Sequence, residues 1–335
     1  MGSDFTAVPI VDIGALVDPD ADPSQKQRAA SAIDTALRTV GFMYVMGHGI
    51  DQGLVDRARL ITRQFFHQDS AVKSKISMEN QDVSVRGYQR LGDNITQGKP
   101  DWHEAIDFYR EIPIGHRLRD DGDPMHSDNQ WPETPAQFKP TFDLYIEKML
   151  QLGAFIMEGV ARACKLPPDY FVRYYDESYW VMRTIYYPAK ESVAKLSNPL
   201  DYGCGEHTDY GCLTMINCDD VQGALVAKNR DNQWIIADPV PGAFIVNVGD
   251  MLSKWTNGVY RSTPHKVNSV PGSDRVSIPF FFEPNYDALI TPLPHFGGSP
   301  GDDDGVVFGE HLSKRVLSNF KYSPNVESDN LVRGL

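Results

Sequence analysis

The chain has 335 residues, a formal net charge of −13, and a hydrophobic share of 41%. This charge argues against nucleic acid or an anionic membrane as partner, because both need a basic surface, and no apolar run is long enough to predict a membrane span. The 4 cysteines form no Cys-x-x-Cys pair, which favours a reducing compartment, so we expect a cytoplasmic protein. Nothing in the pattern indicates the oligomeric state.

The N-terminal part alternates short strands with helices. Residues 8–13 and 41–46 are short apolar runs typical of buried strands. Asp22 is expected to cap a helix with Pro23 in its first turn, and Asp51 is expected to cap a second helix. We therefore predict a helical part over about 1–170 with two short strands.

Residues 80–135 are rich in Gly and Pro and are expected to form loops that carry binding residues. The longest predicted helix follows over about 137–164. An apolar stripe along this helix indicates that it packs on a sheet as part of the core.

The pattern then changes to closely spaced strands separated by Pro-Gly and Asn-Gly turns. Strands this close together predict a double-sheet jelly roll of the cupin kind over about 178–285. A last helix is expected over about 306–320. The predicted fold is mostly β with flanking helices, in a single domain spanning 1–335. The predicted core strands are Trp180–Tyr187, Cys212–Asn217, Ala224–Ala227, Trp234–Ala237, Ala243–Val248, His265–Asn268 and Arg275–Glu283.

Three side chains have the chemistry and spacing of metal ligands. His207 and Asp209 are two residues apart, and on a strand such positions share one face. His265 can supply a third ligand from another strand. Two imidazoles and one carboxylate on one side of a metal leave the other side open, which favours non-haem Fe(II) with room for oxygen and a co-substrate.

Arg275 and Ser277 follow with the same spacing and are expected to share a strand face. A guanidinium binds a carboxylate through two parallel hydrogen bonds, and a neighbouring hydroxyl adds a third. The pair therefore predicts a site for an organic acid close to the metal.

These residues resemble the Fe(II)/2-oxoglutarate-dependent dioxygenases of the isopenicillin-N-synthase-like branch, over about residues 8–320. The resemblance implies a distorted double-stranded β-helix, with iron held by His207, Asp209 and His265. It also implies that Arg275 and Ser277, helped by Tyr187, hold 2-oxoglutarate, with O2 as second co-substrate and ascorbate as a candidate reductant. The motifs that carry it are Gly41–Ile50, Trp102–Asp107, Tyr186–Pro188, His207–Asp209, Asn247–Asp250, Ser262–His265 and Arg275–Ser277.

One position departs from the family pattern. Many plant members have an asparagine two residues before the tyrosine, whereas this chain has Ile185. An aliphatic side chain cannot donate that hydrogen bond, so part of the co-substrate shell differs from theirs.

The loop at 92–101 is similar to that of the bacterial ethylene-forming enzyme. Its arginine-contacting positions correspond to Asn94, Thr96, Arg183 and Tyr210, which become candidate substrate residues together with Phe282 as a cavity wall. Its loop glutamate corresponds to Asn94, and its arginine near the C-terminal helix corresponds to Ser318. Arginine recognition by these positions is therefore not expected.

The expected activity is oxidation, typically hydroxylation, of a small organic molecule with release of succinate and CO2. Two alternatives remain among the oxygenases: ethylene formation, and a 2-oxoglutarate-independent oxidase such as aminocyclopropane-carboxylate oxidase or isopenicillin N synthase. A third alternative is a non-catalytic cupin-like protein that binds a metal or ligand. The sequence does not identify the prime substrate.

Overall fold

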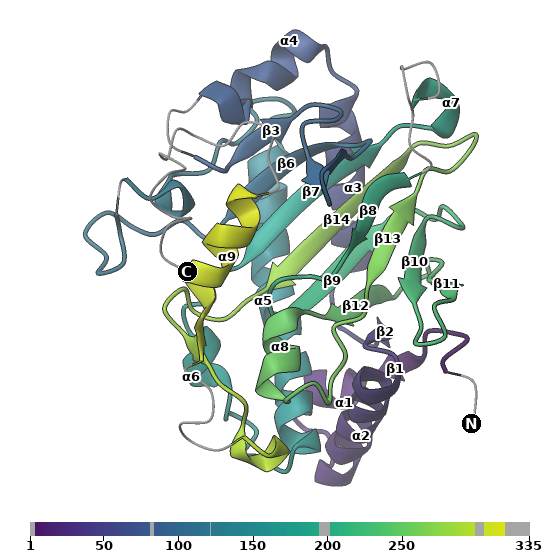
Figure 1. Cartoon of the computed structure of the whole chain (residues 1–335), viewed down its shortest axis with the longest axis vertical. Helices are drawn as coiled ribbons and strands as arrows, with labels where there is room; N and C mark the ends of the chain where they lie inside the picture. The colour runs from purple at the N-terminus through teal and green to yellow at the C-terminus, as the bar shows by residue number, and fades with distance from the viewer. Residues whose placement is uncertain (1–3, 81–83, 121, 194–201, 299–304, 319–335) are drawn as a thin grey trace.

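A computed structural model describes residues 4–80, 84–120, 122–193, 202–298 and 305–318 (Figure 1). Its largest element is a sheet in which β1 pairs parallel to β2 and every other neighbouring pair is antiparallel. In spatial order its strands are β1 (Ile10–Asp12), β2 (Phe42–Met46), β12 (Phe244–Val248), β9 (Leu213–Cys218), β14 (Arg275–Phe282), β7 (Val181–Tyr187), β6 (Glu104–Tyr109) and β3 (Gly87–Gln89).

A second, smaller sheet covers part of one face of the first. Apolar side chains of its strands, such as Leu225 and Val267, form a buried cluster with Ile216 and Ile245 of the large sheet. The two sheets together form the predicted jelly-roll core. In spatial order the small sheet contains β11 (Trp234–Ile236), β10 (Leu225–Lys228), β13 (His265–Asn268) and β8 (Tyr202–His207).

Helices cover the opposite face of the large sheet, where Figure 1 shows α5 running behind the strands. A capping box begins α2, since the Asp22 carboxylate accepts from Ser24 N at 2.7 Å, and Asp51 caps α3 through Leu54 N at 3.0 Å. Both predicted helix starts are confirmed. The helices are α1 (Gly14–Val17), α2 (Pro23–Thr39), α3 (Gln52–Phe66), α4 (Ser70–Lys73), α5 (Phe138–Ala163), α6 (Val172–Tyr175), α7 (Lys190–Val193), α8 (Asp250–Trp255) and α9 (Phe308–Leu317).

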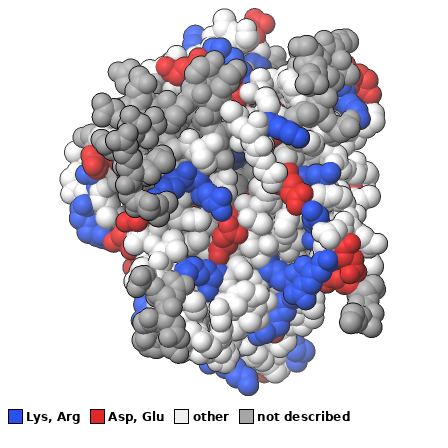
Figure 2. Space-filling view, viewed as in Figure 1, with Lys and Arg blue, Asp and Glu red and all other residues white. Residues whose placement is uncertain are grey.

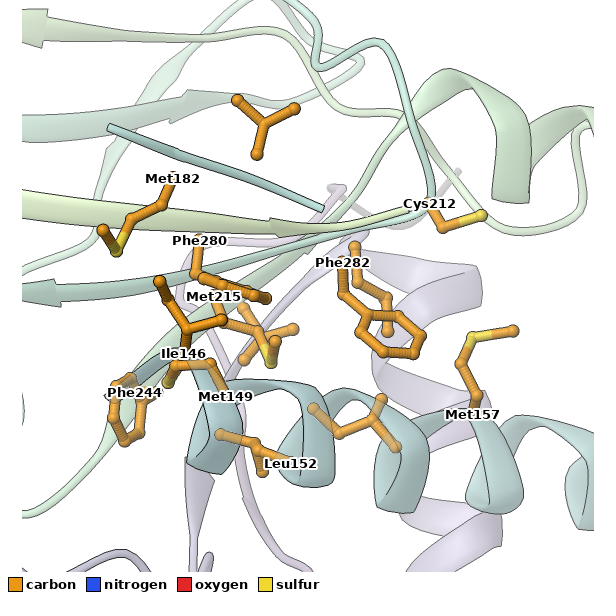
Figure 3. Packing of buried hydrophobic residues seen from close by; sticks show 14 of the residues in the cluster. Ile146, Met149, Leu152, Met157, Met182, Cys212, Met215, Phe244, Phe280 and Phe282 are labelled. Carbon is orange, nitrogen blue, oxygen red and sulfur yellow. The ribbon is translucent and has the colours of Figure 1, made fainter. Parts of the chain in front are cut away.

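Strand β14 belongs to the large sheet and has two different faces. Its even-numbered apolar residues, from Val276 to Phe282, belong to the core cluster that also contains α5. Figure 3 shows Phe280 and Phe282 directed toward Met149 and Leu152 of that helix. Since side chains alternate along a strand, the odd-numbered residues face the other layer.

The structure differs from the sequence expectation in several places. The first 170 residues contain more than two strands, because β3, β6 and the short hairpin of β4 (Ile95–Thr96) with β5 (Lys99–Pro100) lie in the segment expected to be loops. Strand β6 is buried at five of its six positions, so packing between β3 and β7 outweighs the surrounding Gly and Pro. Strand β8 and helix α8 were also not predicted.

The C-terminal helix is shorter than expected. A hairpin of β15 (Leu289–Ile290) with β16 (Val306–Val307) precedes it, and α9 ends at Leu317. The last predicted residues of this helix, 319 and 320, lie outside the described residues. Within the described ranges, no helix is long and apolar enough to cross a membrane.

Candidate iron and co-substrate site

Two histidines meet across neighbouring strands of the small sheet. His207 ends β8 and His265 begins β13, and the two residues are direct cross-strand partners. Their ring centroids are 4.3 Å apart. Residues paired in this way have adjacent side chains on one face, which is why positions distant in sequence converge.

Asp209 does not lie on the same strand, so the expected i, i+2 strand arrangement is wrong. The strand ends at His207, and Asp209 belongs to the loop between β8 and β9. Backbone bonds tie this loop to the start of α8, with Asp250 N donating to Asp209 O and Met251 N donating to Gly211 O, both at 2.8 Å. The unpredicted helix α8 therefore fixes the carboxylate beside the two imidazoles.

Hydrogen bonds orient each of the three side chains. Nδ1 of His207 bonds Gly205 O at 2.8 Å, and Nδ1 of His265 bonds Thr263 O at 3.1 Å. Because a ring nitrogen bonded to a carbonyl carries the proton, each Nε2 keeps its lone pair for a metal.

The carboxylate is held in the same manner. Oδ2 of Asp209 accepts from Thr214 Oγ1 and from Asn247 Nδ2, the latter at 2.6 Å. Oδ1 of Asp209 is 3.6 Å from Nε2 of His207 and 3.6 Å from Nε2 of His265. Three ligand atoms within 4.8 Å of one another can hold one metal ion.

Burial opposes the charge on Asp209, which is 6% exposed. The two imidazoles and the bonds from Thr214 and Asn247 outweigh this effect and lower the pKa of its carboxyl group. An ionised carboxylate with two imidazoles fits Fe(II) and leaves coordination positions open. Iron bound there supplies the activation of O2.

Arg275 lies deep in the protein at the start of β14, opposite Tyr187 of β7, and is 4% exposed. Its Cζ lies 5.3 Å from the centre of the Tyr187 ring. Its Nε and Nη1 have no hydrogen-bond partner in the described structure. A buried cation in this state is costly unless an anion binds it, so Arg275 requires an acidic ligand. Ser277 shares the face of Arg275, two residues along the strand.

Ion pairs fix the backbone on both sides of Arg275. Asp274 accepts from Arg63, and also from Tyr186 Oη at 2.9 Å. Asp219 also accepts from Arg63, and it accepts from Val276 N at 2.7 Å. Helix α3, which carries Arg63, thus positions the strand that presents the guanidinium.

A cavity of about 770 Å³, counted to its open mouth, adjoins His207 and Asp209. Four of the candidate substrate residues, Asn94, Thr96, Arg183 and Tyr210, contribute to its wall. Helix α9 covers one side with Leu312 and Val316. The other lining residues are Ile95, Asp101, Asp107, Tyr109, Val181, Cys204, Phe281 and Glu283.

Arg183 is anchored on the side of the cavity formed by β6 and the loop before β4. Its Nε donates to Asp107 at 2.7 Å, and its Nη2 donates to Asn94 Oδ1 at 2.7 Å and to Gln89 Oε1 at 3.1 Å. Tyr210 lies on the loop of Asp209, beneath the Arg315 guanidinium of α9 at 5.3 Å.

The expectation that Phe282 forms a cavity wall is wrong. A Cβ placed on Gly153 of α5 would lie 2.3 Å from the Phe282 ring, so this ring belongs to the core beneath the sheet. Phe281 lines the cavity instead, as does Glu283. Both share the odd parity of Arg275 and Ser277, and this signal in the sequence could have identified them.

A jelly roll that holds two histidines and a carboxylate within reach of one metal ion, and that also contains a buried arginine without an ion-pair partner among the described residues, is typical of non-haem Fe(II) oxygenases that use an organic-acid co-substrate. Comparison with family models agrees. Residues 8–134 match the N-terminal domain of non-haem dioxygenases in morphine synthesis, and residues 179–284 match the 2OG-Fe(II) oxygenase superfamily.

Similar proteins cover nearly the whole chain. A homoarginine-6-hydroxylase of Oryza sativa subsp. japonica is 42% identical over 96% of this chain and 99% of its own length. One of Arabidopsis thaliana is 41% identical with the same coverage. The crystal structure of a full-length Neurospora crassa protein in complex with alpha-KG superimposes with a TM-score of 0.81, at 25% identity, over 95% of this chain and 98% of that one.

The chain therefore belongs to the 2OG-Fe(II) oxygenase superfamily. It is an enzyme, a non-haem dioxygenase that uses Fe(II), 2-oxoglutarate and O2 to oxidise a small molecule. This finding confirms the predicted class and fold, and it does not support the non-catalytic alternative.

Proposed function

We propose that His207, Asp209 and His265 hold the iron, and that Arg275 grips the distal carboxylate of 2-oxoglutarate with help from Ser277 and Tyr187. The second assignment is supported by Nε and Nη1 of Arg275, which lack a hydrogen-bond partner among the described residues. The likeness to two homoarginine-6-hydroxylases and to a structure in complex with alpha-KG favours 2-oxoglutarate use over the oxidase alternative.

The prime substrate in this proposal is homoarginine or a closely related basic amino acid. This proposal rests on the similarity to two homoarginine-6-hydroxylases, which extends over almost the full length of this chain and of each relative. The cavity supports it, because Glu283 is a buried acid on its wall that forms no ion pair within the described ranges, and such a group favours a cationic ligand. Asn94 and Ser318 do not preclude a cationic substrate, since the Glu283 carboxylate also lines the cavity.

In the proposed reaction, the two atoms of O2 go to two different products. One oxygen atom of O2 enters the substrate as a hydroxyl group, replacing a hydrogen on carbon. The other enters succinate as 2-oxoglutarate loses CO2. The chain's residues position the two organic molecules, and the oxidising chemistry comes from the metal.

The test is turnover of purified protein with Fe(II), 2-oxoglutarate and O2, with homoarginine, arginine, lysine and neutral amino acids supplied one at a time. We expect homoarginine to stimulate succinate release most strongly and to gain one oxygen atom by mass spectrometry. One succinate should form per hydroxylated product.

Three outcomes would contradict this proposal. Stimulation by a neutral amino acid alone would exclude a basic substrate. Ethylene in the headspace, with 2-oxoglutarate consumed and no hydroxylated product, would favour the ethylene-forming alternative. Product without succinate would favour the 2-oxoglutarate-independent oxidases.

We also propose a cytoplasmic location and no nucleic-acid or membrane partner. The four cysteines are free thiols in the structure, as expected in a reducing compartment. Figure 2 shows Lys and Arg side chains interspersed with Asp and Glu on the face drawn there, rather than gathered as a nucleic-acid surface requires. Cell fractionation and a DNA-binding assay test these points.

A further inference from the structure

Glu283 is a buried acid in the substrate cavity for which the iron and co-substrate sites provide no role. It follows β14 directly and is 3% exposed. Its odd parity places its side chain on the cavity side, as for Phe281 two residues earlier.

The other acids that line the cavity already have partners. Asp107 forms an ion pair with Arg183 at 2.7 Å. Asp101 accepts from Gly205 N at 2.9 Å and from Thr96 Oγ1 at 2.7 Å. Asp209 is part of the metal triad.

Glu283 differs from these acids because it lacks a cation. Its Oε2 accepts a single backbone bond, from Cys212 N at 2.8 Å. Within the described ranges, no Lys, Arg or His side chain forms an ion pair with it. A buried carboxylate without a cation is unfavourable, so a cationic ligand would stabilise this group.

The loop that carries Asp209 is shaped to receive this carboxylate. A Cβ on Gly211 would lie 1.4 Å from Oε2 of Glu283, so only glycine leaves the space at that position. Burial, together with the negative charges of Asp209 and Asp250, raises the pKa of Glu283 to about 8, although the Cys212 N–H acts in the opposite direction.

Arg183 and Glu283 both line the cavity and differ in charge and in partners. Arg183 donates to Asn94 on the side near β4, where it also forms an ion pair with Asp107. Glu283 lines the same cavity and is seated on the loop of the metal ligand Asp209. Because Glu283 has no ion-pair partner within the described ranges, a substrate with a cationic side chain would fit with its cation toward this residue.

We propose that Glu283 pairs with the guanidinium group of the substrate and so selects a cationic side chain. This inference rests on the proposed function. Carbon 6 of homoarginine bears a guanidino nitrogen, so an enzyme that oxidises this carbon must hold the guanidinium close to its iron. Glu283, on the loop of Asp209, is placed to do so, and it supplies the carboxylate that Asn94 does not.

The experiment compares homoarginine with homocitrulline, in which a neutral urea replaces the guanidinium at nearly the same shape. The Glu283→Gln variant keeps the size of the side chain and removes its charge. We expect KM for homoarginine to rise about 100-fold, the magnitude typical when one partner of a buried ion pair is removed. KM for homocitrulline should change little, so the preference for the cation is lost.

Comparing KM for homoarginine with KM for homocitrulline separates a loss of recognition from a loss of folding, because a poorly folded variant loses activity toward both substrates. The Glu283→Asp variant keeps the charge and should retain part of the preference. The Glu147→Gln variant, at an exposed position of α5, makes the same chemical change away from the cavity and should behave as wild type.

The experiment distinguishes failure of the Glu283 assignment from failure of the proposed function. If the wild-type enzyme turns over homoarginine and Glu283→Gln keeps the wild-type preference over homocitrulline, the assignment of Glu283 is overturned and the proposed function stands. If the wild-type enzyme turns over no basic amino acid, the proposed function fails and this inference fails with it.

Discussion

Arg275 illustrates how one side chain can reveal a ligand. Its guanidinium is buried, it rests against the Tyr187 ring, and two of its nitrogens have no partner in the described structure. The network of Arg63, Asp219 and Asp274 positions this residue. Such an arrangement is favourable only when an anion completes it.

Replacing Arg275 with lysine should therefore weaken the binding of 2-oxoglutarate far more than the binding of iron. Lysine keeps the charge but loses the planar pair of donors that matches a carboxylate. We expect KM for 2-oxoglutarate to rise at least about tenfold, measured by succinate release, with metal affinity nearly unchanged. The matched control is Arg38→Lys, at an exposed ion pair on α2. Unchanged KM for 2-oxoglutarate in the Arg275 variant would remove the residue from the co-substrate site.

At the scale of elements, β14 joins the core to the catalytic cavity. Its even-numbered residues pack on α5, and its odd-numbered residues face the site. The contact between α5 and β14 is close at Gly153, where a methyl group would overlap the Phe282 ring at 2.3 Å. Because a packed interior has little free space, this glycine sets the distance between helix and strand.

The Gly153→Ala substitution should thus destabilise the protein, although alanine favours a helix. Overpacking typically costs about 1–3 kcal/mol, which outweighs the gain of about 1 kcal/mol in helix propensity. Urea denaturation followed by circular dichroism measures the change. The Gln151→Ala variant, at an exposed position of the same helix, is the control and should show little loss. Equal stability of the Gly153 variant and wild type would contradict the packing argument.

At the scale of the molecule, the candidate site connects separate layers. His207 and His265 come from the small sheet, and Asp209 comes from a loop bonded to α8. Arg275 comes from the large sheet, whose far face is covered by helices. Ligands that bind these groups in the folded state should stabilise the whole structure.

Mn²⁺, a redox-silent substitute for iron, should accordingly raise the melting temperature of the metal-free protein by roughly 5 °C at saturating concentration. Adding 2-oxoglutarate should raise it further, and more strongly with the metal present than without it, since the co-substrate chelates the ion. The His265→Ala variant should lose most of the metal effect. If Mn²⁺ raised the melting temperature of the His265→Ala variant as much as that of the wild type, the metal would bind elsewhere.

By itself the sequence determined the ligand types, the jelly-roll core and the helix starts, because each depends on local chemistry. Histidine and carboxylate donors select the metal, and Asp22 and Asp51 cap helices wherever they precede one. Closely spaced strands with turn signals leave few fold classes.

Only the tertiary structure decided which side chains face the cavity and how the ligands meet. Strand β14 is buried along nearly its whole length, so its apolar residues do not alternate with polar ones, and only their parity relative to Arg275 and Ser277 separates Phe281 from Phe282. The two glycines of Tyr202–His207 weaken the local strand signal, and pairing with β13 forms that strand. Asp209 reaches the histidines through a loop held by α8, a contact between distant segments that no local pattern records.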